Sequence, residues 1–259
     1  MAVADGTCRI RINRPDSLNS VTADVLHDMA DAVEQAGTEP DVRVIVLSGA
    51  GRAFCSGADI VNSRRLDSLD EADDDSTVAT LDAANRLVAA VRDVPRPVVS
   101  VVQGPCAGVG VSVAIAADLV LASSQAFFML AFTKIGLMPD GGATALVAAS
   151  AGRAKAMRMA LLAERMSANE AAAAGLVTHV LDSDAFDAGV ESVIDELRSG
   201  PMTAFARTKH AINAATLGPL DAALALEREG QIGLLASDDF AEGIDAFRTK
   251  RTPTFGDTA

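Results

Sequence analysis

The sequence predicts an α/β core followed by a helical C-terminal section. Strand-like apolar runs mix with helical patterns as far as Leu181, and every segment beyond Asp184 has a helical pattern. Residues 98–102 form a β-branched run, which is typical of a strand buried on both faces. Hydrophobic residues make up 49% of the 259 residues and aromatic residues only 3%. The core must therefore be packed mainly from Ala, Val and Leu, and the chain is long enough for one large domain with or without an appendage.

The N-terminal third contains two predicted strands and two predicted helices. Residues 8–13 alternate apolar and polar side chains, and Thr22 can cap a helix. We expect strands at 8–13 and 42–47 and helices at 22–35 and 78–94, the last stopped by Pro95 and Pro97. The charged run at 60–76 predicts a solvated loop in a place where it could serve as a lid.

The stretch 98–122 organises the rest of the chain. Its strand is interrupted by small and turn-forming residues: Gly104, Pro105, Gly108 and Gly110. An apolar run of helical length follows at 109–117, and Asp118 opens another short strand. A helix N-terminus reached through small residues presents free backbone N–H groups, which can hold a phosphate or an oxyanion. Gln103 and Asp118 interrupt the apolar run, so we expect a buried core and no membrane span.

The remaining elements are predicted to be short. Ser167 and Glu170 form a capping-box pattern that opens a helix, and Gly175 closes it. We expect strands at 127–130 and 177–181, a loop at 134–142, and helices at 143–150, 153–163, 185–199, 203–215, 219–235 and 238–248.

Composition and charge exclude several classes of function. The formal net charge of -13 argues against binding to nucleic acid, which requires clustered Lys and Arg. No CxxC motif occurs among the three cysteines, and the three histidines are scattered, so we expect reduced thiols and no metal site. The N-terminus carries no apolar signal segment. We therefore expect a cytoplasmic protein.

Four motifs in order resemble one enzyme family. Two glycine loops, GRAFCSGADI at 51–60 and QGPCAGVG at 103–110, each follow a buried strand. Residues 167–177 and the tail SDDFAEGIDAF at 237–247 complete the set. Together they strongly resemble the enoyl-CoA hydratase/isomerase family, the crotonase superfamily, and the likeness covers nearly the whole chain.

The resemblance implies a spiral of ββα turns as the core, over residues 1–198, and a helical trimerisation section at 199–259. It also implies an acyl-CoA substrate with no separate cofactor, and a homotrimer or a dimer of trimers. Two backbone N–H groups, by position those of Ala58 and Val109, would bind the thioester oxygen. The other residues that the resemblance places against the substrate are Ser56, Gly57, Gly108, Ser112, Phe132, Met138, Phe247 and Lys250, the last two reaching a neighbouring subunit's CoA.

The chain departs from the family pattern at the acid/base groups. The two glutamates of the hydratases align with Ser112 and Phe132, neither of which can move a proton as a carboxylate does. Asp16 stands where the family often has a basic residue near the CoA phosphates. Asp140 aligns with the catalytic aspartate of some family isomerases, although an Asp before Gly-Gly is also an ordinary helix cap. Nearby apolar residues would raise the pKa of Asp140 into the working range.

The sequence therefore favours double-bond isomerisation of an enoyl-CoA over hydration, with Asp140 as the proton carrier. Two alternatives remain open at this stage. One is an acyl-CoA-binding protein that has lost its chemistry. The other is a hydratase that uses other residues, or a thioesterase with water activated by Asp140.

Overall fold

A six-stranded sheet runs through the centre of the molecule in the order β1-β2-β3-β4-β6-β9. The structure is a computed structural model that describes residues 1–60 and 74–256. The strands of this sheet are Ala2–Ala4, Thr7–Ile12, Val44–Gly49, Val98–Val102, Leu119–Ser123 and His179–Leu181. Neighbouring strands are parallel except for β1, which pairs antiparallel with β2.

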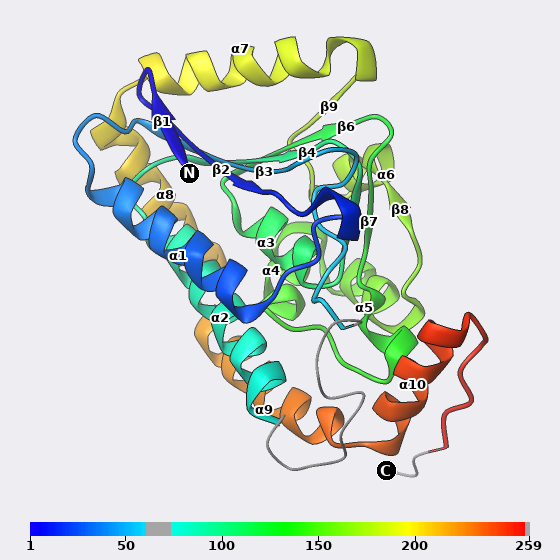
Figure 1. Cartoon of the computed structure of the whole chain (residues 1–259). Helices are drawn as coiled ribbons and strands as arrows, with labels where there is room; N and C mark the ends of the chain where they lie inside the picture. Colours follow the sequence, from blue (N-terminus) through cyan, green and yellow to red (C-terminus); the bar gives the residue numbers. More distant parts are fainter. Residues whose placement is uncertain (61–73, 257–259) are drawn as a thin grey trace.

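Helices cover both faces of the sheet (Figure 1). On one face, alternate strand residues such as Val46, Val99 and Leu121 pack against α7 (Phe186–Ser199). The intervening residues, such as Leu47 and Val98, face the main core. The helices grouped below the sheet in Figure 1 include α1 (Ala23–Thr38), α2 (Asp74–Asp93), α3 (Val109–Ala116) and α4 (Ala143–Ala151). Burial on both faces explains why β3, β4 and β6 are almost continuously apolar.

A second, smaller sheet lies beside α3 and carries the chain toward the candidate site. It consists of β5 (Pro105–Ala107), β7 (Phe127–Met129) and β8 (Met166–Ser167). The remaining elements are η1 (Pro15–Ser17), η4 (Ala131–Ile135), α5 (Arg153–Leu162), α6 (Ala168–Ala173), η5 (Ser183–Ala185), α8 (Met202–Thr216), α9 (Leu220–Leu235) and α10 (Asp238–Thr249).

The α/β prediction is confirmed, and so are the helices expected from the sequence. Thr22 caps α1 by accepting a hydrogen bond from the Val25 N–H, and Ser167 and Glu170 form the expected capping box. The strand expected at 42–47 instead begins at Val44, because the Val42 N–H is bonded to the Glu39 carbonyl in a turn.

Three strands were not expected from the sequence: β1, β5 and β8. Each has two or three residues, too few for a periodic pattern to be distinguished. They form because their backbone groups pair with neighbouring strands: β1 with β2, and β5 and β8 with β7.

The charged loop expected at 60–76 falls mostly outside the described residues. At its C-terminal end the expectation was wrong, because α2 already begins at Asp74, four residues before the predicted start. Acidic residues favour the first turn of a helix, where they interact with the exposed N–H groups.

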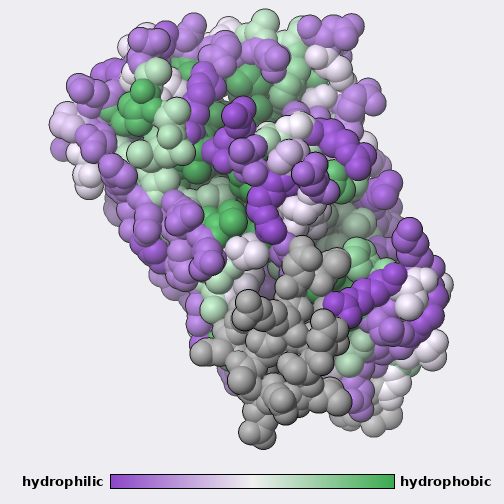
Figure 2. Space-filling view, viewed as in Figure 1, coloured by the Kyte–Doolittle hydropathy of each residue, from purple (hydrophilic) through white to green (hydrophobic). Residues whose placement is uncertain are grey.

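Hydrophilic residues cover much of the face drawn in Figure 2, including the regions of α1 and α10. Within the described residues, no helix is both long enough and apolar enough to cross a bilayer. The apolar stretch 98–122 is divided among β4, β5, α3 and β6.

Candidate active site

The two glycine loops run side by side in register. Cys55 and Cys106 form a parallel β-bridge, and the Ala107 N–H donates to the Cys55 carbonyl at 2.9 Å. The Cys55 N–H in turn donates to the carbonyl of Pro105 at 3.3 Å. Three residues beyond the bridge, the two loops reach Ala58 and Val109. The pairing therefore brings together the two amides that the sequence singled out.

Glycine is required where the loops touch. Gly57 has φ +106° and Gly108 has φ +55° with ψ -135°, conformations that L-residues with a Cβ rarely adopt. A Cβ on Gly57 would lie 3.3 Å from the Ala107 carbonyl oxygen, and one on Gly108 would lie 3.4 Å from the Gly57 Cα. Both glycines thus allow an approach of backbone to backbone that side chains would prevent.

The N–H groups of Ala58 and Val109 donate no hydrogen bond within the described parts of the chain, although their neighbours do. The residues flanking Ala58 are paired with Val21, which accepts from the Asp59 N–H at 2.8 Å and donates to the Gly57 carbonyl at 2.9 Å. Val109 is the first residue of α3, where the amide has no partner within the helix. Two free N–H groups beside a helix N-terminus can bind an oxyanion.

A turn near the N-terminus holds the first loop in place. Arg14 donates to the Ser20 carbonyl and to Asp59 Oδ2, both at 2.7 Å. The Asn19 side chain is fully buried and donates to the carbonyls of Ala50 and Ala53. Asn19 itself has φ +60°, a conformation that asparagine tolerates better than most residues.

The two loops open into a cavity of about 560 Å³. Its buried wall is largely apolar and includes Leu81, Phe132, Leu137, Leu235 and Phe240. The cavity brings together most of the residues expected from the sequence: Ser56, Gly57, Ala58, Gly108, Val109, Phe132, Asp140 and Phe247.

Asp140 is the buried carboxylate of this wall. Its side chain is 8% exposed, and Oδ2 accepts a hydrogen bond from Gln231 Nε2 at 2.9 Å. The other oxygen, Oδ1, is buried and has no partner in the described structure. Burial raises the pKa of Asp140 to about 7, an effect that the Gln231 hydrogen bond reduces and the nearby Glu227 increases. Both protonation states are therefore populated near neutral pH.

The alternative role of Asp140, as an ordinary helix cap, does not occur. The cap residue of α4 is Gly142, and the Asp140 side chain accepts from no backbone N–H in the described structure. Glu227 of α9 takes that role, accepting from the N–H groups of Gly142 at 2.7 Å and Thr144 at 2.9 Å. Burial raises the pKa of Glu227 and these hydrogen bonds lower it. Asp140 is therefore free for another task.

Gln231 and Glu227 were not identified from the sequence. Both lie on α9, and they are 2% and 1% exposed. They share the helix face of Leu220, Leu224 and Leu235. Two polar residues at core positions of an apolar helical stripe were the signal that could have revealed them.

Two residues expected to contact the substrate of their own chain, Ser112 and Met138, do not line the cavity. Ser112 is fully buried behind it, and its hydroxyl donates to the Asp140 main-chain carbonyl at 2.7 Å. Met138 packs under α9, where a Cβ on Gly230 would lie 2.5 Å from its Sδ. Lys250 follows the end of α10, exposed and with φ +56°.

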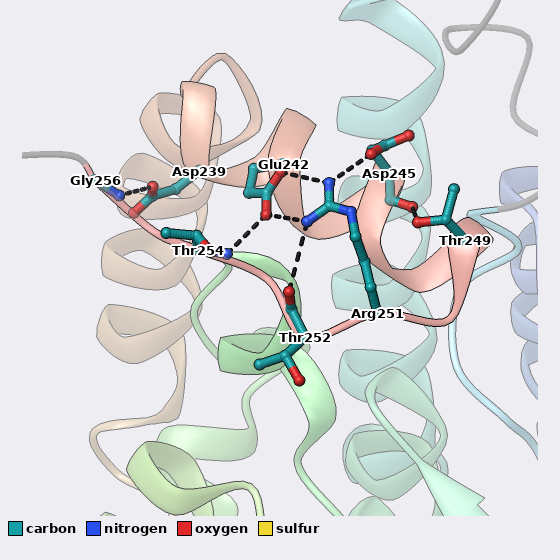
Figure 3. Close-up of polar contacts among 8 residues, drawn as sticks. All are labelled: Asp239, Glu242, Asp245, Thr249, Arg251, Thr252, Thr254 and Gly256. Atoms are coloured by element: carbon teal, nitrogen blue, oxygen red, sulfur yellow. Dashed lines mark hydrogen bonds and ion pairs between the residues drawn. The ribbon is translucent and has the colours of Figure 1, made fainter.

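The C-terminal segment folds back along α10, next to the cavity. Arg251 donates to both carboxylate oxygens of Glu242 and to Asp245, and Glu242 also accepts from the Thr254 N–H at 2.7 Å (Figure 3). The Arg251 hydrogen bonds lower the pKa of Glu242 to about 2. These contacts of Arg251 with Glu242 and Asp245, the clamp on α10, lie on both sides of Phe247 in the sequence, a residue that is 56% exposed and lines the cavity from the same chain.

Other polar groups have structural roles. Burial raises the pKa of the Cys55 thiol to about 12 and that of Cys106 well above its ordinary value, so neither is an activated nucleophile. Asp118 Oδ2 accepts from the Val98 N–H at 2.7 Å and so satisfies the amide at the start of β4. Lys134, which could face either ligand or solvent, is exposed and also lines the cavity.

Comparisons with known proteins agree with this geometry. The family described as Enoyl-CoA hydratase/isomerase matches residues 3–258. A probable enoyl-CoA hydratase of Rhodobacter capsulatus is 40% identical over 253 residues, which cover 98% of this chain and 95% of that protein. A 1,2-epoxyphenylacetyl-CoA isomerase of Escherichia coli K12 is 36% identical over 253 residues, covering 98% and 96% of the two chains.

Among solved structures, an enoyl-CoA hydratase from Mycobacterium avium subsp. paratuberculosis superposes with a TM-score of 0.91. It is 56% identical in sequence, and the match covers 99% of this chain and 97% of that chain. The chain thus belongs to the enoyl-CoA hydratase/isomerase family and has its crotonase fold.

Proposed function

We propose that this enzyme isomerises the double bond of an enoyl-CoA. The observation that carries the proposal is Asp140, a carboxylate in the cavity wall with one unpartnered oxygen and a pKa near 7. The positions of the two hydratase glutamates hold Ser112, which lies behind the wall, and Phe132. A single proton carrier suits a reaction that takes a proton from one carbon and returns it to another.

In the proposed mechanism, the thioester carbonyl accepts hydrogen bonds from the N–H groups of Ala58 and Val109. These donors stabilise the negative charge that develops on the oxygen when a proton leaves the substrate. Removal of one such donor costs about 2.7–4 kcal/mol in enzymes of known mechanism. Because both donors are backbone groups, the side chains at positions 58 and 109 have little influence on this step.

Asp140 then moves one proton. As a carboxylate it takes a proton from C2 of a 3-enoyl-CoA, and the electron pair of that C–H bond forms a dienolate with the C3–C4 double bond. The neutral Asp140 returns the proton to C4, leaving the double bond between C2 and C3 and the mass unchanged. Such acid/base groups contribute roughly 10²–10⁴-fold to a rate. The apolar wall keeps competing water from the dienolate.

The wall also indicates the kind of acyl group. Among the described residues, its buried polar side chains are Ser20, Asp59, Asp140 and Gln231, and none is a cation. A second carboxylate on the acyl chain would lose its hydration there without gaining a partner. We therefore propose an uncharged acyl group.

The test is incubation of the purified protein with a 3-enoyl-CoA and, separately, a 2-enoyl-CoA, followed by separation and mass analysis. We expect the two to interconvert without a change of mass, and Asp140→Asn to abolish this conversion while still binding CoA ester. The exposed Asp184 provides a matched control, since Asp184→Asn should leave the rate unchanged. Retained turnover in Asp140→Asn would refute the mechanism.

The other outcomes identify other functions. A gain of water on the 2-enoyl substrate would mean hydration, and release of free CoA would mean thioester hydrolysis. Tight binding without any change of either ester would favour an acyl-CoA-binding protein.

We also propose that the enzyme works in the cytoplasm as a homotrimer or a dimer of trimers. Exposed apolar residues on α5, namely Met157, Leu161 and Leu162, support a buried subunit contact. Free, buried cysteines suit a reducing compartment. Light scattering coupled to size-exclusion chromatography should give three or six times the chain mass, and a monomer would contradict the proposed assembly.

A further inference from the structure

The α9 face that borders the site carries two polar residues in an otherwise apolar stripe. Glu227 and Gln231 are four residues apart and almost completely buried. Burial of polar groups at such positions is costly unless their hydrogen bonds are satisfied. Here the Gln231 side chain is bonded to the loop that carries Asp140, and the Glu227 side chain is bonded to the start of α4.

The orientation of the Gln231 amide is fixed by the main chain. The Met138 N–H can only donate, and it donates to Gln231 Oε1 at 3.1 Å. Nε2 must then lie on the other side of the amide, where it donates to the Met138 carbonyl at 3.1 Å and to Asp140 Oδ2 at 2.9 Å. A flipped amide would leave the Met138 N–H facing an NH₂ group.

This arrangement distinguishes the two oxygens of Asp140. Oδ2 is held as an acceptor by an N–H in both protonation states, so it is the poorer place for a proton. Oδ1 is buried and has no other partner in the described structure. We propose that Gln231 is a positioning residue that directs the exchanged proton to Oδ1 of Asp140, and that Glu227, bonded to the N–H two residues beyond Asp140, places a second carboxylate near the same group. The inference rests on the proposed isomerase function.

Gln231 and Glu227 act on Asp140 in opposite directions. The Gln231 hydrogen bond favours the carboxylate and lowers its pKa, while the charge of Glu227 disfavours the carboxylate and raises it. The other charged side chains that line the cavity among the described residues are Asp16, Asp59 and Lys134. These three are unchanged in the variants below, so they cannot produce shifts of opposite sign.

The first measurement needs no substrate. The side-chain carboxyl of Asp140 is titrated by ¹³C NMR in the ligand-free full chain, its signal being assigned by its loss in Asp140→Asn. We expect Gln231→Met to raise its pKa by about one unit, since a hydrogen bond to the charged form is lost. Glu227→Gln should lower it. Glu229 lies on the same helix and is exposed, so Glu229→Gln should leave the pKa of Asp140 unchanged.

The second measurement is the pH profile of kcat/KM with a 3-enoyl-CoA. Asp140 must be ionised to accept the first proton, so activity falls as the pH drops through its pKa. The acidic limb of the profile should move to higher pH in Gln231→Met and to lower pH in Glu227→Gln. Gln231→Glu retains an acceptor for the Met138 N–H but loses the donor to Asp140, so it should move the limb upward even if Gln231→Met folds poorly.

Shifts of the same sign in both variants, or no shift in either, would overturn the inference. Failure of the underlying function is distinguishable from this result. If Asp140→Asn still isomerises the substrate, the proposed function is wrong. If Asp140→Asn is inactive while the pKa of Asp140 is unchanged by both substitutions, only the role of Gln231 and Glu227 is wrong.

Discussion

Asp140 combines a proposed chemical role with a cost in stability. The same burial that raises its pKa from 3.8 to about 7 makes its charged form unfavourable in the folded protein. Between these two values the folded protein holds a proton that the unfolded chain releases. The contribution of this group to stability is therefore complete below about pH 4 and is lost as the pH rises through about 7.

Replacement of Asp140 by Asn should remove this pH dependence. The stability of the variant relative to the unmodified protein should increase as the pH rises from 4 to 7, by on the order of 4 kcal/mol at most, because a shift of three units corresponds to that difference. Urea unfolding at pH 4.5, 6 and 8 measures it. A constant difference across this range would show that Asp140 has an ordinary pKa.

A second prediction at the scale of single residues concerns Gly108. Gly108→Ala should reduce kcat by roughly 10²–10³-fold, because a strained backbone there displaces the Val109 N–H from the thioester oxygen. Gly152 is the matched control: it also has positive φ (+78°), but a Cβ added there would meet no atom within 4 Å, and it lies outside the cavity. Gly152→Ala should lose stability and keep its kcat. Equal loss of kcat in both variants would argue against the placement of the Val109 donor.

Candidate site residues in contiguous loop motifs were easier to find from the sequence than residues that reach the site from a distant helix. Ala58, Val109 and Asp140 lie in contiguous loop motifs, and the cavity contains all three. Gln231 reaches Asp140 from 91 positions away, and no local pattern records that distance. Ser112 was expected in the pocket because of its place in the motif, but the direction of its hydroxyl depends on how α3 packs against residue 140.

At the scale of elements, the long helices were predictable, whereas of the five described strands with two or three residues only β7 and β9 were. α1 and α9 have enough turns for an apolar stripe to be visible, whereas β5 has three residues. β5 nevertheless sets the register of the second glycine loop through the pairing of Cys55 with Cys106. Its formation depends on partner strands that lie far away in the sequence, which is why local propensity does not reveal it.

The clamp on α10 leads to a prediction about one element. Arg251→Ala should free the segment 252–256, because the Arg251 bonds to Glu242 and Asp245 hold its start. Exposed ion pairs contribute little to global stability, so the free energy of unfolding should hardly change. Hydrogen exchange should instead show faster exchange at the amides of Thr254 and Gly256. Unchanged protection would mean that the carboxylates of α10 hold this segment without Arg251.

At the scale of the whole molecule, the C-terminal helices are tied into the core. α9 supplies Glu227 to the N-terminus of α4 and Gln231 to Asp140. α8 is attached at the other end of the sheet, where Asn213 donates to the Arg92 carbonyl at 3.1 Å. The site is therefore built from both the expected core, 1–198, and the expected helical section, 199–259.

Substitution of Lys209 can measure how strongly α8 is attached to the core. Its Nζ donates to Asp118 and to the carbonyls of Val91 and Arg96, and its side chain is 8% exposed. Lys209→Met should destabilise the protein by about 1–3 kcal/mol, since the partly exposed Asp118 carboxylate would lose its ion-pair partner. Lys155→Met, at a partly exposed position on α5, should change stability by less than about 0.5 kcal/mol. Denaturant unfolding compares the two, and equal effects would show that the Lys209 pair is dispensable.

Both proposed oxyanion donors are main-chain groups, and this affects how the reaction of such an enzyme can change during evolution. Substitutions at positions 58 and 109 leave the N–H groups in place as long as the glycines beside them are kept. The groups that handle protons, in contrast, are ordinary side chains on the surrounding wall, and each can be replaced without rebuilding the loops. A chain of this design can therefore acquire a new reaction through one or two substitutions while it continues to hold the same thioester.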